Sequence, residues 1–319
     1  MTVLVLAREF DPTADAVVLA LVDRGTPVLR SDLSAFPTQL VLDARLTGGQ
    51  WTGRLSNEYH GVALTELVSI WNRNPSSYSF PEDMTAEEQR YAYREARLGL
   101  GGVLASLDVL WANHPNRCAD AIFKPYQWKL ATECGLRVAN TVITNDPEAV
   151  RRFAERAEHG AIVKSLGAAS ITEEDEIKVA FTRRLSDEDL RDLRSVAVTA
   201  TTVQEWVPKA FEVRLTVIGQ EWFPIAIHAS TPASYTDWRS EPSALSYEFV
   251  PIPQSVVDGV RGYLARANLA YAGFDFVVRP DDEWVMLEAN SGPQFGWLEA
   301  ATGAPMAAAM ADMLTKGAA

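Results

Sequence analysis

The sequence is poor in cysteine and has no long apolar run. Cys118 and Cys134 are the only cysteines among 319 residues, too few for a disulfide framework and without the spacing of a zinc site. We therefore expect the protein to reside in the reducing cytoplasm. The apolar residues 3–7 are followed at once by Arg8 and Glu9, so they predict a buried first strand, not a signal or membrane segment. No membrane partner is expected.

Basic residues are also in short supply. The chain has 29 Lys and Arg against 42 Asp and Glu, for a net charge of −13. This balance argues against a surface that wraps nucleic acid or docks on an anionic membrane. No internal repeat or low-complexity segment is evident. Because basic residues are few, one inside an apolar segment is a candidate for a functional role.

Short apolar segments alternate with helical patterns along the chain, and the length predicts two or three lobes. A helix is predicted after Asp11-Pro12, and a strand at residues 67–71. The first part should be a small α/β domain with a mostly parallel sheet. The fold class predicted for the whole chain is α/β, with α+β lobes.

Two apolar runs, residues 274–278 and 285–290, flank a turn-rich cluster at residues 279–283. They predict an antiparallel hairpin. A turn centred between residues 281 and 282 places Asp275 opposite Glu288, and Asn290 shares the face of Glu288. Two opposed carboxylates repel each other, and a magnesium ion would neutralise them. The alternative is that these are polar strand ends that face water.

Lys124 and Lys164 each lie beside apolar neighbours. Together they suggest two phosphate contacts, although each could instead extend to solvent. The segment 167–170, which ends at Ser170, could wrap phosphate oxygens with backbone amides, or be an ordinary turn. Further along, Glu212 and Arg214 share a strand face. They form either a local ion pair, or a cleft-facing acid for a sugar hydroxyl and an arginine for a phosphate.

Two polar loops carry further candidates. Arg73 follows the strand at residues 67–71, at a position where ligands bind in open α/β sheets. It is equally consistent with a solvated loop arginine. The loop with Asp237 and Arg239 could recognise substrate, but position alone favours a solvated loop.

In chain order, short segments match those of a known family. They are Ile70-Trp71-Asn72-Arg73, Lys124-Pro125, Val163-Lys164, Gln204-Glu205-Trp206-Val207, Asp237-Trp238-Arg239 and Leu287-Glu288-Ala289-Asn290. In this order they resemble the ATP-grasp ligases, and most closely the ATP-grasp ribosomal peptide maturases, or graspetide synthetases. Relatives usually carry a tyrosine and paired arginines after the tryptophan, where this chain has Asn72, Arg73 and Asn74. That difference bears on the substrate and not on the nucleotide chemistry.

The resemblance implies an ATP-grasp fold in three parts: a pre-ATP-grasp α/β domain (1–120), a small central subdomain (121–201) and a C-terminal subdomain with the hairpin (202–319). It implies ATP and Mg²⁺ as cofactors. The implied ATP-binding residues are Lys124, Lys164, Ser170, Glu205, Trp206, Val207 and Glu212. The implied magnesium ligands are Asp275, Glu288 and Asn290, Arg214 faces the transferred phosphate, and Arg73, Asp237 and Arg239 lie near the peptide.

The activity implied is ATP-dependent ligation within a precursor peptide, whose leader docks on the enzyme while its core is cyclised. Asp or Glu side chains are activated as acyl phosphates and joined to Thr, Ser or Lys side chains, and such ligases are often homodimers. The alternative is an ATP-grasp ligase that acts on a small molecule or adds amino acids to a protein terminus. A third possibility is a nucleotide-binding regulatory protein, against which both lysines and the three hairpin residues count.

Overall fold

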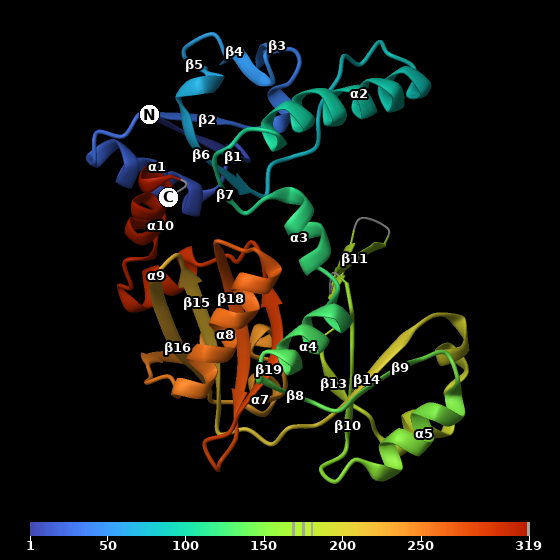
Figure 1. The fold of residues 1–319 in the computed structure, drawn as a ribbon. Coiled ribbons are helices and arrows are strands. Elements are labelled where there is room, and N and C mark those ends of the chain that lie inside the picture. The colour runs from blue at the N-terminus through green and yellow to red at the C-terminus, as the bar shows by residue number, and fades with distance from the viewer. Residues whose placement is uncertain (168–169, 174–175, 180, 318–319) are drawn as a thin grey trace.

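The computed structural model describes residues 1–167, 170–173, 176–179 and 181–317, with the backbone alone described at 170–173 and 176–179. Figure 1 shows three lobes: the N-terminal part at the top, a large sheet below it, and a small sheet beside that. Among the described helices, none is long and apolar enough to cross a membrane.

The N-terminal lobe is built on a sheet in the order β2-β1-β6-β7. All its neighbouring strands are parallel, which confirms the predicted α/β arrangement. Its strands are β1 (Thr2–Ala7), β2 (Val28–Ser31), β6 (Leu67–Arg73) and β7 (Leu110–Ala112). Helix α1 (Pro12–Asp23) begins where predicted because Asp11 caps it: its Oδ1 accepts from the Ala14 N–H at 3.0 Å.

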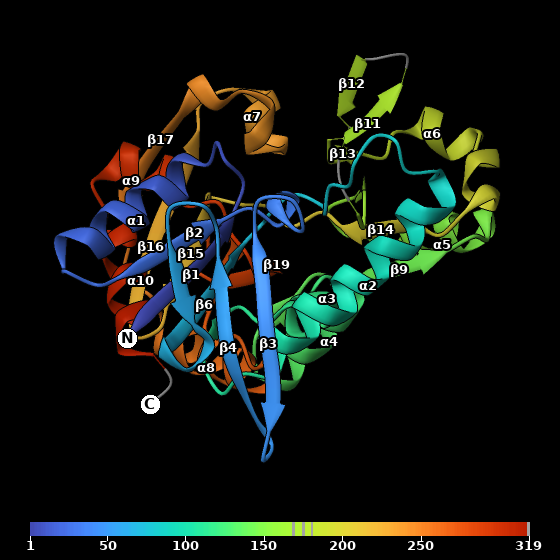
Figure 2. The ribbon, with the colours of Figure 1, turned by 90° about the horizontal axis from the view of Figure 1, so that it is seen from above.

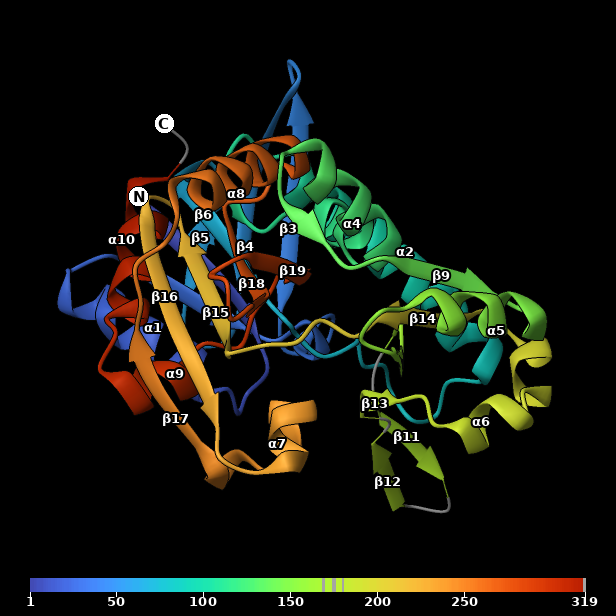
Figure 3. The same cartoon turned by 90° about the horizontal axis from the view of Figure 1, so that it is seen from below.

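A long antiparallel ribbon leaves this lobe. It comprises β3 (Val41–Thr47), β4 (Gln50–Ser56) and β5 (Gly61–Ala63), and Figures 2 and 3 show its tip standing clear of the molecule. The tip is the two-residue turn Gly48-Gly49, with φ of +60° and +83°. Helix α2 (Ala86–Ala105), capped by Thr85, and helix α3 (Pro115–Ala121) follow.

The central lobe carries a sheet in the order β13-β10-β14-β9. Its strands are β9 (Thr141–Thr144), β10 (Ala161–Lys164), β13 (Arg183–Arg184) and β14 (Thr201–Glu205). Helices α5 (Pro147–Arg156) and α6 (Asp187–Arg191) and the hairpin of β11 (Ser170–Glu173) and β12 (Glu176–Val179) complete it. Residues 206–210 then run to the large lobe as a single extended segment (Figure 3).

The large lobe contains a six-stranded sheet in the order β17-β16-β15-β18-β19-β8. Its strands are β8 (Arg137–Val138), β15 (Phe211–Ile218), β16 (Glu221–Ala229), β17 (Leu245–Phe249), β18 (Tyr271–Val278) and β19 (Trp284–Asn290). Helices α4 (Lys124–Glu133) and α8 (Gln254–Ala267) cover one face of this sheet. Three more helices follow in the chain: α7 (Pro232–Thr236), α9 (Gly296–Thr302) and α10 (Met306–Lys316).

Strand alternation decides which side chains reach the open face of this sheet. Val213 and Leu215 of β15, and Phe274 and Phe276 of β18, pack in the core under α4 and α8. The residues between them must point the other way. This places Glu212, Arg214 and Asp275 on the open face, toward the central lobe.

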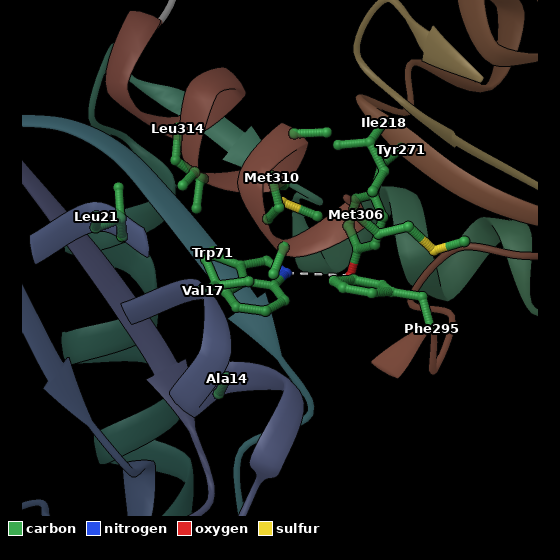
Figure 4. Packing of buried hydrophobic residues seen from close by; sticks show 14 of the residues in the cluster. Ala14, Val17, Leu21, Trp71, Ile218, Tyr271, Phe295, Met306, Met310 and Leu314 are labelled. Atoms are coloured by element: carbon green, nitrogen blue, oxygen red, sulfur yellow. Dashed lines mark hydrogen bonds between the residues drawn. The ribbon is translucent and has the colours of Figure 1, made fainter. Parts of the chain in front are cut away.

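The end of the chain returns to the N-terminal lobe. In Figure 4, Met306, Met310 and Leu314 of α10 pack with Val17 and Leu21 of α1 and with Trp71. The Trp71 indole N–H donates to the Tyr271 hydroxyl at 3.2 Å. One apolar cluster therefore joins the first and last parts of the sequence.

The predicted segments 121–201 and 202–319 interleave in the structure. Helix α4 and strand β8 pack with the six-stranded sheet, whereas β14 belongs to the central sheet. The domain boundaries at residues 120 and 201 stay predictions.

Candidate active site

A cleft of about 650 Å³ lies between the open face of the six-stranded sheet and the central sheet. It brings together most of the residues that the sequence predicted. Those that line it are Lys124, Lys164, Glu205, Trp206, Val207, Glu212, Arg214, Asp237, Arg239, Asp275, Glu288 and Asn290. A larger hollow of about 1100 Å³, lined by Trp222 and Arg261, contains none of them.

The opposed carboxylates of the hairpin are confirmed. Asp275 of β18 pairs directly with Glu288 of β19, and Gly273 pairs with Asn290. Nearer the turn the register differs by one residue, because an irregularity beside Asp275 leaves Leu287 unpaired. The amide of Asn290 lies beside Glu288, with Nδ2 3.4 Å from Oε1.

Three cations neutralise these two carboxylates. The Lys124 ammonium donates to Glu288 Oε2. Arg239 bridges the pair, with Nη2 3.3 Å from Glu288 Oε1 and 3.4 Å from Asp275 Oδ2. Arg214 Nε lies 2.8 Å from Asp275 Oδ1. The interpretation of these residues as strand ends facing water is therefore wrong: Asp275 is 3% exposed.

The two carboxyl groups differ in acidity. Burial raises the pKa of Asp275, and the neighbouring Arg214 opposes that rise only in part. Burial also acts to raise the pKa of Glu288, but the charge and hydrogen bond of Lys124, together with the charges of Arg239 and Arg214, outweigh burial and lower the pKa overall. Asp275 is therefore the weaker acid of the two.

The phosphate-contact candidates behave differently from each other. Lys124 is tied to Glu288, whereas the Lys164 ammonium lies 5.0 Å from the centre of the Trp128 ring. Burial lowers the pKa of Lys164 to about 8, with Glu288 opposing the shift. The side chain of Ser170 lies outside the described residues, so its predicted role stays a prediction.

The segment of Glu205, Trp206 and Val207, which the resemblance implies binds ATP, has hydrogen-bonding groups without a partner in the described chain. The Glu205 and Trp206 N–H groups donate to the carbonyls of Asn140 and Gly160, at 2.9 and 2.8 Å. Within the described chain no group accepts from the Val207 N–H. The buried Gln204 Oε1 likewise has no donor. A donor and an acceptor are therefore available at this end of the cleft.

Glu212 and Arg214 do not form the local ion pair that was one alternative. Glu212 pairs with Lys209, a buried residue that sequence reasoning missed, and Arg214 pairs with Asp275. The signal for Lys209 was weak, since it is a single lysine after a proline and three residues before an acid.

Neither Arg73 nor Asp237 is a solvated loop residue, so that alternative is wrong for both, while their roles near the peptide stay predictions. Arg73 ends strand β6, is 1% exposed and does not line the cleft; its Nε lies 3.4 Å from Asp11 Oδ2. Its Nη2 donates to Oε1 of Gln294, which does line the cleft and was also missed. Asp237 is 7% exposed, not solvated, and its Oδ2 accepts from the Thr182 N–H at 3.2 Å.

The donor set suits a hard divalent cation. Asp275, Glu288 and Asn290 offer oxygen atoms on one sheet face, as magnesium sites do. The described residues contain no group of three or more His, Cys, Asp or Glu placed around a metal site. Two carboxylates and one amide would fill only part of the coordination shell of magnesium and leave its other coordination positions to water and phosphate. Lys124 and Arg239, which now pair with the carboxylates, could then pair with phosphate oxygens.

The sequence matches the family model described as the MvdD pre-ATP-grasp domain over residues 2–118. A search of curated proteins found no match. Among solved structures, the macrocyclase MdnC bound to the precursor peptide MdnA, from Microcystis aeruginosa MRC, is 27% identical, with 99% of this chain and 100% of that chain covered and a TM-score of 0.84.

Two further structures are similar over nearly their whole length. The macrocyclase MdnB from Microcystis aeruginosa MRC is 26% identical, with 98% of each chain covered and a TM-score of 0.79. A RiPP-associated ATP-grasp ligase from Chryseobacterium gregarium, in complex with ADP and a leader and core peptide, is 24% identical, with 99% of this chain and 96% of that chain covered and a TM-score of 0.91. The chain thus has an MvdD-type pre-ATP-grasp domain and the ATP-grasp fold, and its resemblance to the ATP-grasp ribosomal peptide maturases is confirmed.

Proposed function

We propose that this chain is an ATP-dependent peptide ligase. It would activate Asp or Glu side chains of a ribosomally made precursor as acyl phosphates, and join them to Thr or Ser hydroxyls or to Lys amines of the same peptide. The observation that carries the proposal is the opposed pair Asp275 and Glu288 in a cleft with five lysine and arginine side chains. Similarity to macrocyclases across the whole chain supports it.

The nucleotide would lie along the cleft in a defined direction. The strand end at Glu205, Trp206 and Val207 would hold the adenine edge, and Glu212 the ribose. Lys124 and Lys164 would contact the phosphates. Asp275, Glu288 and Asn290 would hold magnesium, which offsets charge on the phosphoryl oxygens when bound.

Both chemical steps depend on positioning and charge. In the first, a carboxylate oxygen of the peptide attacks the γ-phosphorus of ATP and ADP leaves. In the second, the hydroxyl or amine attacks the acyl carbon, inorganic phosphate leaves and the nucleophile loses its proton. Arg214 and Arg239 reach Asp275 from two sides, where they can stabilise negative charge on the transferred phosphoryl group.

The peptide would approach from the side of the cleft where Gln294 and the loop of Asp237 and Arg239 lie. Arg73, being buried, would act there through Gln294. We place the enzyme in the cytoplasm as a homodimer. The free thiols of Cys118 and Cys134 fit the first assignment, and the resemblance to graspetide synthetases supports the second.

A short reading frame beside the gene, rich in Thr and in Asp or Glu, would supply the substrate for a test. Incubation of that peptide with the enzyme, ATP and magnesium should remove one water for each bond formed, measured by mass spectrometry. An unchanged peptide mass together with measured ATP binding would contradict peptide ligation. It would favour a ligase that acts on a small molecule or on a protein terminus.

A further inference from the structure

Lys209 is buried in the cleft and is not explained by the reaction as described. It is 7% exposed and lines the cleft beside Glu212. Its ammonium donates to Glu212 Oε1. The ammonium also lies 5.1 Å from the centre of the Tyr235 ring and 5.8 Å from that of Trp206.

These contacts fix Lys209 in one place. Two aromatic rings and a carboxylate surround its charge, and cation–π contacts strengthen where water is excluded. Its backbone is held too, because the Tyr235 hydroxyl donates to the Lys209 carbonyl at 2.7 Å. Separating a buried ion pair leaves an uncompensated charge at high cost. Lys209 is therefore committed to Glu212 and not available to a phosphate.

Glu212 lies between the two ends of the cleft. Along β15 it is two residues from Arg214, about 7 Å, and Arg214 pairs with the candidate metal ligand Asp275. Toward the other end, its partner Lys209 reaches Trp206 of the purine-facing segment. A nucleotide that spans both ends would place its ribose beside Glu212.

The two oxygens of Glu212 are not equivalent. Oε1 is taken by Lys209, and in the described part of the chain no group donates to Oε2. Burial raises the pKa of Glu212, and the charge of Lys209 opposes that rise. Without Lys209 this carboxyl group would gain a proton more readily, and a protonated carboxyl is a poorer acceptor for two hydroxyls.

We propose that Lys209 is a positioning residue for nucleoside recognition. By holding Oε1 of Glu212, it keeps the second oxygen turned toward the ribose, where that oxygen accepts hydrogen bonds from the vicinal hydroxyls. The chain thereby selects ribonucleotides over nucleotides that lack both hydroxyls. This inference rests on the proposed function, since it requires that the cleft bind ADP.

Calorimetric titration of the full chain with ADP and with 2′,3′-dideoxy-ADP tests the proposal without the peptide. The wild-type protein should bind ADP at least about tenfold more tightly, the range for hydrogen bonds to a charged group. In Lys209→Met the two dissociation constants should come within about threefold of each other. Lys209→Gln, which keeps a donor without the charge, should give an intermediate ratio.

A second pair of variants covers the case in which Lys209→Met does not fold, as judged by thermal unfolding. Lys209→Met combined with Glu212→Gln removes both charges. The ratio of its dissociation constants for 2′,3′-dideoxy-ADP and ADP should equal the ratio for Glu212→Gln alone. Weaker ADP binding in Lys209→Met with the wild-type ratio would overturn the proposal, because Lys209 would then contact another part of the nucleotide. A wild-type ratio near one would also overturn it. A wild-type protein that binds neither nucleotide would instead contradict the proposed function itself.

Discussion

Lys164 shows how burial tunes a single side chain in the cleft. Its ammonium lies over the Trp128 ring, and burial brings its pKa down to about 8. Nucleotide phosphates would favour the charged form and raise that pKa again. Below about pH 8 the charge is already present in the free protein. Above it, binding must take up a proton.

We therefore expect ADP affinity, measured without magnesium, to fall as the pH rises from about 8 toward 10. The loss should approach tenfold per pH unit. Lys164→Arg is the matched control, because arginine stays charged throughout and should flatten the profile. A wild-type profile that is flat over the same range would show that Lys164 does not contact the phosphates.

Arg73 is a second residue whose surroundings decide its role. It is fully buried between Asp11 and Gln294, and Asp11 also caps α1. Arg73→Met would leave the Asp11 carboxylate without its buried partner. The free energy of unfolding should fall by about 3 kcal/mol, measured by urea denaturation.

Gln294→Ala is the control for Arg73→Met, because it removes the other, exposed partner of Arg73 and should change stability by less than about 0.5 kcal/mol. If Arg73→Met were as stable as the wild-type protein, Arg73 would not stabilise the fold through Asp11. That result would favour a direct contact between Arg73 and the substrate.

The hairpin of β18 and β19 depends on the close approach of Pro293 and Arg214 to Gly273. Gly273 pairs with Asn290, and a Cβ added there would lie 2.8 Å from the Pro293 Cβ and 3.1 Å from Arg214 Nη1. Gly273→Ala must therefore displace the Pro293 loop or Arg214. We expect a loss of about 2 kcal/mol in stability and a slower reaction.

Gly99→Ala provides the comparison for Gly273→Ala. Gly99 lies within α2, and a Cβ there meets nothing within 4 Å. The same substitution should raise stability by roughly 0.5 kcal/mol or more. Thermal unfolding of the two variants checks both signs, and a Gly273→Ala variant as stable and active as wild type would contradict the packing argument.

The hairpin also shows how far sequence reasoning reaches. Apolar runs and turn residues predicted that Asp275 faces Glu288, but not the unpaired Leu287, which depends on packing across the sheet. The β3–β4 ribbon was missed although Gly48-Gly49 signals its turn, because charged residues such as Asp43 and Arg45 interrupt the apolar pattern. Lys209 and Gln294 were missed because their partners become neighbours only in the folded chain.

At the scale of the whole molecule, the last helix completes the first lobe. α10 packs on α1 and β6, and the Ser69 hydroxyl donates to the Leu314 carbonyl at 2.8 Å. Residues 1–120 alone would expose the apolar surface that α10 covers. We expect this fragment to lack a cooperative thermal transition, and residues 305–317 joined to it by a flexible linker to restore one. A fragment 1–120 that melts cooperatively at the Tm of the full chain would contradict this.

The proposed function requires that the cleft couple ATP cleavage to bond formation within a peptide. The most direct measurement is the ratio of ADP released to water lost from the peptide that the reading frame beside the gene encodes. Chromatography measures the ADP and mass spectrometry the loss of water, on the same samples. We expect the wild-type protein to release one ADP for each bond formed. In Glu288→Gln, shown to be folded by circular dichroism, ADP release and the loss of water from the peptide should both be at least about a hundredfold slower. ADP release with no change in peptide mass, or wild-type turnover in Glu288→Gln, would contradict the proposed function.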